Sequence, residues 1–254
     1  MVIELRDVRK VYRDRQGQEV AAVAGVTLRV EAGETVCLIG PSGCGKTTTM
    51  KLINRLVEPT AGEVAVDGKD VRTLDAITLR RQMGYVIQSG GLFPHLTVAR
   101  NVGLLCRLGG WKRERVRQRV AGLLALVNLP EAEYGHRYPR DLSGGQRQRV
   151  GVARALALDP PIVLMDEPFG ALDPITRDQV HEEFKQLKAR MGKTIVLVTH
   201  DMAEAFKLSD RVVLMDRGAI VQVGTEIDFR ERPASAFVTD FLKSHLTADA
   251  AAHG

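Results

Sequence analysis

The sequence predicts an α/β fold with a mostly parallel core sheet, an antiparallel β-subdomain at the N-terminus and a helical subdomain inserted into the core. Three observations support this fold class. Most strand-like segments are continuous apolar runs, which is typical of strands buried on both faces of a parallel sheet. Residues 2–30 instead form a pattern of two strands around a polar turn. Residues 92–157 show helical spacing without a strand signal.

The expected elements follow in chain order. Residues 2–12 and 19–30, on either side of the polar turn 13–18, predict an antiparallel pair. Buried strands are expected at residues 36–40, 63–68, 83–88, 162–166, 194–200 and 211–216. We expect a single domain at 1–245, with 1–91 and 158–224 as the core with its β-subdomain, 92–157 as the helical subdomain, 225–245 as C-terminal helices and 246–254 as a frayed tail.

The composition is that of an ordinary soluble globular protein, with 44% hydrophobic and 26% charged residues. No apolar run approaches the roughly 20 residues that a membrane-spanning helix needs, and the N-terminus lacks the pattern of an export signal. We therefore expect a cytoplasmic protein. The three cysteines, Cys37, Cys44 and Cys106, form no CxxC pair and are odd in number. This pattern favours reduced thiols over disulfides or a zinc site, and we expect no structural metal.

The net charge of +5 raises the question of a nucleic-acid or membrane surface. The densest basic stretch comprises Arg107, Lys112, Arg113, Arg115, Arg117 and Arg119. Apolar residues recur at helical spacing in the same region, namely Val116, Val120, Leu124 and Val127. The pattern predicts an amphipathic helix with an arginine-rich exposed face. Such a face usually only solubilises, and contact with lipid headgroups or a partner is the alternative.

A phosphate-binding pattern, GxxxxGK[ST], lies between the apolar strand that precedes it and a helical segment that follows. Its residues are Gly40, Pro41, Ser42, Gly43, Cys44, Gly45, Lys46 and Thr47. Glycines let backbone N–H groups converge on phosphate oxygens, and the helix adds its positive N-terminal end. A glycine-rich turn without a ligand is the alternative, which the strand-before, helix-after context disfavours. The segment therefore predicts a P-loop nucleotide-binding fold.

Each polar residue of this loop has an expected role toward ATP and Mg²⁺. Lys46 would reach the β- and γ-phosphates, and the hydroxyl of Thr47 would coordinate Mg²⁺. Thr48 could donate a hydrogen bond to the α-phosphate. Because Cys44 lies inside the loop, we also hypothesise that alkylating it blocks nucleotide binding.

Two carboxylates end the apolar strand at 162–166, at the edge where open α/β sheets place ligands. Asp166 is expected to hold Mg²⁺, and Glu167 to take a proton from the attacking water. Two acids that simply end a strand are the alternative, which the phosphate-binding loop in the same chain disfavours. His200 follows the apolar strand at 194–199 and reaches the same edge, where packing or helix capping is the alternative role.

The pentapeptide Leu142-Ser143-Gly144-Gly145-Gln146 resembles the signature of ATP-binding cassette (ABC) ATPases, which alone combine it with a P-loop. It opens the helical segment 146–158, so Ser143, Gly144 and Gly145 would form a second phosphate-binding helix N-terminus, with Gln146 in its first turn. The resemblance covers about residues 1 to 245 and implies the ABC ATPase fold with a RecA-like core.

The resemblance implies that the P-loop of one subunit and the signature of its partner clamp the same ATP. It further implies four roles outside the three main motifs. Tyr12 would stack on adenine, with strand packing as the alternative. Gln88 would act as the Q-loop ligand to Mg²⁺ and water, Asp173 as the D-loop residue and His200 as the switch histidine at the γ-phosphate.

Each motif occurs once, so the resemblance implies a Mg²⁺-dependent ATPase that pairs with a copy of itself or a close relative. Membrane-spanning permease subunits would hold the pair at the cytoplasmic face of the membrane, and a substrate-binding protein would act indirectly. We expect no nucleic-acid partner.

A narrower resemblance is to the ATPases of importers for glycine betaine, carnitine, choline and similar quaternary amines. It rests on the segments 51–56, 58–60, 79–81, 84–88 and 91–98. Some members carry a C-terminal regulatory domain, and we expect none within this chain. An importer for another small solute, such as an amino acid, is the alternative.

Two remoter functions are disfavoured. A non-transport ABC ATPase acting on nucleic acid would carry long insertions or two fused cassettes, and neither is present in this sequence. A GTPase of the P-loop class would carry a guanine-reading NKxD motif, but the sequence contains no Asn-Lys dipeptide.

Overall fold

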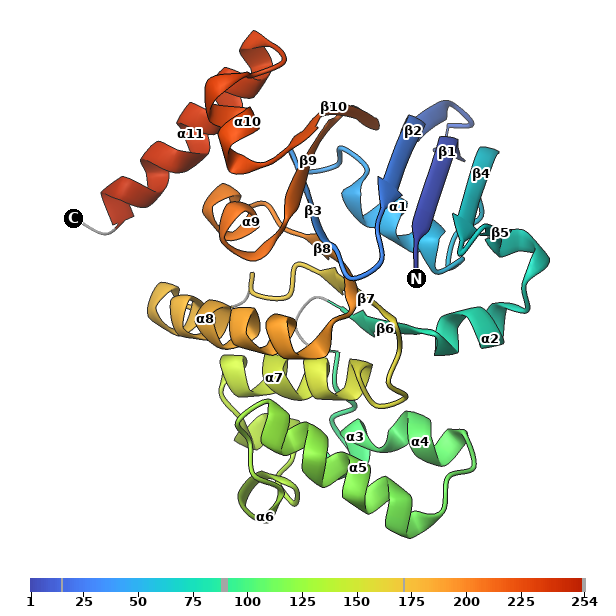
Figure 1. Cartoon of the computed structure of the whole chain (residues 1–254), viewed down its shortest axis with the longest axis vertical. Helices are drawn as coiled ribbons and strands as arrows, with labels where there is room; N and C mark the ends of the chain where they lie inside the picture. Colours follow the sequence, from blue (N-terminus) through green and yellow to red (C-terminus); the bar gives the residue numbers. More distant parts are fainter. Residues whose placement is uncertain (15, 88–90, 171, 253–254) are drawn as a thin grey trace. The chain divides into compact units, whose positions relative to one another are not determined.

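The chain folds into two units, which are described separately here. The computed structural model describes residues 1–14, 16–87, 91–170 and 172–252. The first unit comprises Met1–Arg80 and Thr194–Gly254, and the second comprises Arg81–Lys193 (Figure 1). Both units contain helices and strands, which confirms the predicted α/β class.

An antiparallel sheet in the first unit has the strand order β2-β1-β4-β5. Its strands are β1 (Ile3–Arg13), β2 (Glu19–Val30), β4 (Ala61–Val66) and β5 (Lys69–Asp70). The predicted pairing of the first two strands is confirmed. The segment 63–68, however, joins this sheet through β4, so its assignment to the buried parallel strands was wrong. Asp67 and Gly68, both with positive φ, form the two-residue turn that pairs β4 with β5.

Four further strands of the first unit run in the order β10-β9-β3-β8. They are β3 (Thr35–Ile39), β8 (Thr194–Val198), β9 (Arg211–Asp216) and β10 (Ala219–Gly224). β3 pairs in parallel with both β8 and β9. Every residue of β3 and β8 is buried, which explains their continuous apolar sequences. Only β10 is antiparallel to its neighbour, because a tight turn at Arg217 and Gly218 reverses the chain after β9.

The first unit also contains helical elements (Figure 1). They are α1 (Lys46–Ile53), η1 (Val71–Thr73), α2 (Ala76–Arg81), α9 (Met202–Leu208), α10 (Glu226–Glu231) and α11 (Ala236–Ala252). The last two lie where C-terminal helices are expected, and the backbone of α11 continues helically to Ala252. Among the described residues, no helix has the length and apolar character needed to cross a membrane.

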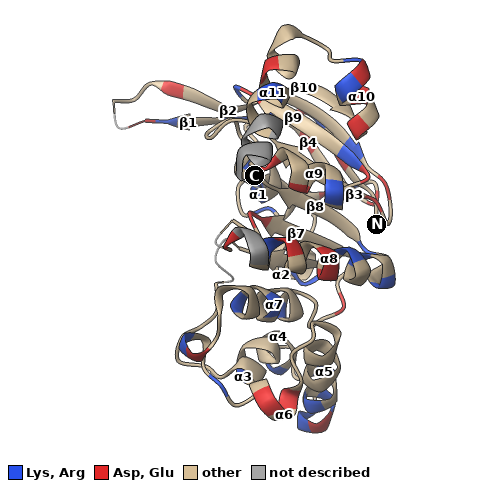
Figure 2. Ribbon diagram, turned by 90° about the vertical axis from the view of Figure 1, so that its left-hand side faces the viewer, with Lys and Arg blue, Asp and Glu red and all other residues tan. Residues whose placement is uncertain are grey.

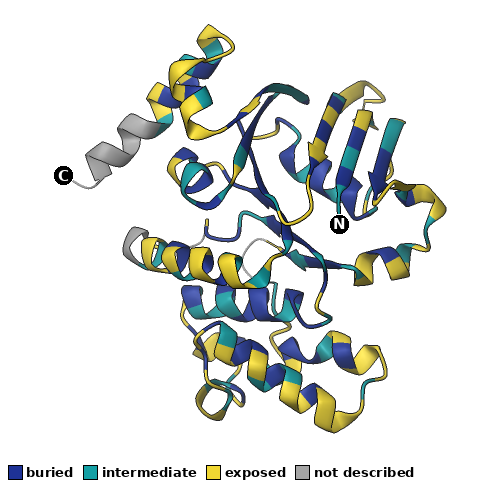
Figure 3. Cartoon of the chain, in the orientation of Figure 1, coloured by how far each residue is buried: buried dark blue, intermediate teal, exposed yellow. Residues whose placement is uncertain are grey.

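Within the described residues, the second unit contains the parallel strand pair β6 (Met83–Val86) and β7 (Ile162–Asp166) and several helices. These are α3 (Val98–Val102), α4 (Leu104–Leu108), α5 (Arg113–Leu126), α6 (Glu131–Tyr134), η3 (Pro139–Asp141), α7 (Gly144–Ala155) and α8 (Pro174–Met191). Helices α3 to α7 fall within the segment 92–157. Figure 3 shows α7 as largely buried, whereas α5 is exposed along one side.

The predicted amphipathic helix corresponds to α5. Its four apolar positions at helical spacing, Val116, Val120, Leu124 and Val127, are all buried. Arg115 and Arg117 are exposed, as expected for the polar face. Arg119 differs, because its guanidinium donates hydrogen bonds to the carbonyls of Leu156 and Ala157 at 2.7 and 3.0 Å. This arginine therefore satisfies carbonyls at the C-terminal end of α7 instead of facing solvent.

Candidate functional site

The phosphate-binding loop joins β3 to α1, with its path fixed by glycines. Gly40, Gly43 and Gly45 have φ angles of 140°, 80° and 104°. A Cβ atom on Gly40 would lie 2.1 Å from the carbonyl oxygen of Met215, and one on Gly45 would lie 2.3 Å from that of Ala22. The loop therefore depends on residues without a side chain at these two positions, for steric as well as conformational reasons.

The ammonium group of Lys46 lies inside this loop. The side chain is 7% exposed, and its Nζ donates hydrogen bonds to the carbonyls of Gly40 at 2.7 Å and Pro41 at 2.9 Å. A buried ammonium inside a glycine-rich loop at a helix N-terminus is a donor set that suits phosphate oxygens. Thr47 and Thr48, at the first turn of α1, are half-buried. The residues present thus fit a nucleotide phosphate.

Cys44 is a buried member of the loop. Its thiol is 3% exposed, and the Sγ lies 3.7 Å from the Lys46 Nζ. Burial raises the pKa of the Cys44 thiol, and the neighbouring ammonium opposes this shift only in part. All three cysteines are free and buried.

The two carboxylates at the end of β7 differ in backbone conformation. Glu167 has a φ of 45°, which is left-handed backbone and costs a non-glycine residue about 1–2 kcal/mol. The strand therefore ends at Asp166, and the chain turns at the next residue.

Tyr85 is a neighbour of this carboxylate pair that sequence reasoning missed. Its hydroxyl lies 3.5 Å from Oδ2 of Asp166, toward which it donates a long hydrogen bond. Burial, together with the Asp166 charge, raises the pKa of Tyr85 to about 12, so the phenol stays protonated at neutral pH. The parallel pairing of β6 with β7 brings the two residues together.

The signature segment forms a closed cap at the start of α7. The Ser143 Oγ accepts a hydrogen bond from the Gln146 N–H at 3.2 Å, and the Gln146 Oε1 accepts one from the Ser143 N–H at 2.9 Å. Ser143 is exposed, and its hydroxyl proton can still be donated. Gly145 is buried against α8, where an added Cβ would approach Thr176 Cγ2 to 3.0 Å. Helix α7 thus begins close to α8 with Gly144 and Gly145, two residues that have no side chains.

Three further candidates lie at exposed positions. Asp173 caps α8, accepting a hydrogen bond from the Thr176 N–H at 3.0 Å. His200 is exposed, and the side chain that caps α9 is that of Asp201. Tyr12 is 42% exposed, with the Lys10 Nζ 5.0 Å from the centroid of its ring. Gln88 lies outside the described residues.

The candidate residues divide between the units. Tyr12, His200 and the loop 40–48 belong to the first unit. Asp166, Glu167, Asp173 and the segment 143–146 belong to the second unit. Their roles toward a nucleotide stay predictions.

Comparison with known proteins gives consistent matches. A family model described as "ABC transporter" matches residues 23–170. The choline transport ATP-binding protein OpuBA of Bacillus subtilis (strain 168) is 53% identical over 241 residues, which cover 95% of this chain and 62% of that protein. The glycine betaine uptake system ATP-binding protein YehX of Escherichia coli (strain K12) is 48% identical over 241 residues, covering 95% of this chain and 76% of that protein. This chain thus spans about three fifths of OpuBA and about three quarters of YehX.

A solved structure matches as well. It is the dimeric ATP-binding cassette MJ0796 in a post-hydrolysis state bound to ADP and Pi. The match has a TM-score of 0.78 and 36% sequence identity, and it covers 88% of this chain and 98% of that chain.

Proposed function

The chain belongs to the ABC transporter family, and on that premise we propose that it is the Mg²⁺-dependent ATPase subunit of an importer for quaternary ammonium osmoprotectants. One observation carries the ATPase part of this proposal. The chain contains two different helix starts suited to phosphate, namely the glycine-constrained loop with buried Lys46 before α1 and the capped signature before α7. The relatives OpuBA and YehX, named for choline and glycine betaine, support the substrate class.

We infer that the active form of the ATPase is a pair of such subunits. Each chain has one P-loop and one signature, so two copies provide two complete ATP sites if each site takes one part from each copy. The dimeric state of the related MJ0796 cassette supports this arrangement. Closure of the pair around two ATP molecules would bring the signature of one copy to the γ-phosphate held by the other.

Each residue in the site has a defined task in hydrolysis. Lys46 binds phosphate oxygens and stabilises the charge that develops during transfer, with His200 acting at the γ-phosphate. Glu167 accepts a proton from the attacking water. Thr47, Asp166 and Gln88 would hold Mg²⁺, which neutralises phosphate charge when bound. Tyr12 provides an exposed ring for adenine stacking, and Asp173 contributes the D-loop.

The helical part of the second unit supplies the proposed contact with permease subunits at the cytoplasmic face of the membrane. A surface hollow of about 930 Å³ there has a wall with more arginines than glutamates, the latter being Glu114 and Glu131. Four arginines contribute to it, namely Arg100, Arg107, Arg113 and Arg117. Figure 2 shows Lys and Arg residues along α5, which forms part of this wall. Such a surface suits an acidic segment of a membrane subunit. The substrate-binding protein would contact the permease and act on this chain only indirectly.

Replacing Glu167 with glutamine tests the proposed hydrolysis directly. Glu167→Gln keeps the side-chain shape and removes the proton acceptor, so the variant should bind ATP, accumulate as an ATP-bound dimer and hydrolyse ATP at least about a hundredfold more slowly. ATPase turnover and size-exclusion chromatography with ATP measure these effects.

The matched control is Glu231→Gln, which changes an exposed glutamate on α10 and should leave turnover unchanged. Near-normal turnover of Glu167→Gln would refute the assignment of the base. Transport assays with glycine betaine and with an amino acid, using the assembled importer, distinguish the proposed substrate class from its alternative.

A further inference from the structure

Tyr85 and Asp166 lie on the same face of the strand pair β6 and β7. The register pairs Tyr85 with Leu164, and side chains two residues apart along a strand point to the same face. Asp166 follows Leu164 by two residues and therefore lies on the face that carries Tyr85, at the end of β7. This placement brings the Tyr85 hydroxyl to 3.5 Å from Oδ2 of Asp166.

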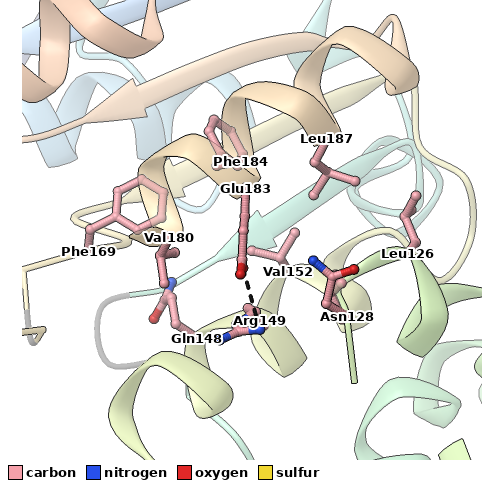
Figure 4. Close-up of a pocket in the computed structure, with 11 residues that line it drawn as sticks. Leu126, Asn128, Gln148, Arg149, Val152, Phe169, Val180, Glu183, Phe184 and Leu187 are labelled. Carbon is pink, nitrogen blue, oxygen red and sulfur yellow. Dashed lines mark ion pairs between the residues drawn. The ribbon is translucent and has the colours of Figure 1, made fainter. Parts of the chain in front are cut away.

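The backbone around Asp166 is held on both sides. Before it, Met165 pairs with Val86 of β6. After it, the chain is anchored by the buried Phe169, whose ring centroid lies 5.6 Å from that of Phe184 on α8 (Figure 4). These contacts do not fix the rotation of the Asp166 carboxylate, because the terminal torsion of an aspartate has broad minima.

The Tyr85 hydroxyl restricts this rotation. A phenol is protonated at neutral pH and can donate one hydrogen bond, whereas an ionised carboxylate only accepts. The carboxylate has about four acceptor sites on its two oxygens, so Oδ2 can accept from Tyr85 while the group also coordinates a metal ion. At 3.5 Å the bond is longer than the common O–H···O distance of about 2.7–2.8 Å. Hydrogen bonds in active sites are often long before the reactants bind and tighten in the complex.

We propose that Tyr85 is a positioning residue for Asp166, whose carboxylate its hydroxyl holds in the orientation that binds Mg²⁺. This inference rests on the proposed role of Asp166 in the ATPase. Carboxylate oxygens are ligands that Mg²⁺ prefers, and Asp166 is only half-buried, so the residue fits that role. Octahedral coordination has strict geometry, so a carboxylate that already points in the required direction binds the ion more tightly. Removing a group that orients a metal ligand typically costs about 10–100-fold in metal affinity.

The variant Tyr85→Phe tests this role, because it removes only the hydroxyl and keeps the ring. Equilibrium dialysis measures the affinity for a non-hydrolysable ATP analogue, once in EDTA and once in saturating Mn²⁺, which serves as the probe for the metal. The affinity in EDTA should equal that of the parent chain, and the gain in affinity from Mn²⁺ should be about tenfold smaller. An unchanged gain would overturn the inference, and so would an equal loss of affinity in EDTA, which would indicate a merely structural role.

Tyr138→Phe is the matched control, since it removes the hydroxyl of an exposed tyrosine in the same unit. This variant should keep the full gain from Mn²⁺. In the ATPase assay, Tyr85→Phe should raise the half-saturating Mg²⁺ concentration about tenfold and leave the turnover at saturating Mg²⁺ close to that of the parent chain.

The variant Asp166→Asn separates this inference from the proposed function. It should lose at least as much of the gain from Mn²⁺, and adding Tyr85→Phe to it should cause no further loss. Additive losses would show that Tyr85 acts apart from Asp166 and would overturn the inference. If Asp166→Asn keeps the gain, the proposed metal role of Asp166 fails, and the role of Tyr85 fails with it. If Asp166→Asn loses the gain and Tyr85→Phe keeps it, only the role of Tyr85 fails.

Discussion

At the scale of single residues, Cys44 offers a chemical probe of the phosphate-binding loop. Its thiol is buried beside the Lys46 ammonium, and burial raises its pKa. Because the thiolate is the reactive form, we expect Cys44 to react with iodoacetamide more slowly than a free cysteine at neutral pH. The rate should increase as the pH rises toward the elevated pKa. Mass spectrometry of the time course measures the rate.

Complete alkylation of Cys44 should abolish ATP binding, because the added group would fill the loop where phosphate is expected. A Cys44→Ala variant that retains Cys37 and Cys106 is the control, and its ATP affinity should survive the same treatment. Unchanged ATP affinity of the fully modified wild-type chain would contradict the proposed position of the nucleotide.

The loop glycines could be predicted from sequence because the constraint on them is local. A fixed spacing of glycines between a strand and a helix already implies backbone that other residues cannot adopt. Tyr85 could not be found in this way, because its approach to Asp166 depends on how β6 pairs with β7.

At the scale of elements, the start of α7 combines helix capping with the proposed phosphate contact. Ser143→Ala removes the oxygen that accepts from the Gln146 N–H and should lower the free energy of unfolding by about 1 kcal/mol. Ser143→Asp keeps a capping oxygen, so it should retain stability while losing ATPase activity, because a carboxylate repels the γ-phosphate. Urea unfolding and turnover measurements separate the two effects.

The matched control is Thr225→Ala, since Thr225 and Asp228 form the same reciprocal cap at the start of α10. This variant should lose a comparable amount of stability and keep its ATPase activity. Wild-type turnover in Ser143→Asp would mean that the signature cap is purely structural.

Sequence patterns predicted the position of some strands in the fold correctly and of one strand wrongly. Continuous apolar runs correctly predicted β3, β7, β8 and β9, because strands covered on both faces need apolar residues throughout. The same reasoning misplaced β4, because an apolar run does not identify the partner strand. The Asp67-Gly68 turn that follows β4 was the better signal, since this dipeptide favours a tight antiparallel hairpin.

At the scale of the whole molecule, the proposed ATP hydrolysis needs a pair of chains. The P-loop and the signature lie in different units of one chain, and each occurs once. The family membership and the α/β fold could be predicted from sequence because short motifs and local sequence patterns indicate both. The proposed pairing could not be derived from spacing, because it would depend on a surface that forms only between two copies.

A crystal structure of Glu167→Gln with ATP and Mg²⁺ shows whether two copies share each nucleotide site. We expect a dimer in which Ser143 and Gly145 of one copy donate hydrogen bonds to the γ-phosphate of the ATP bound at Lys46 of the other. A structure with both triphosphates bound, and with Ser143 and Gly145 far from each of them, would contradict it.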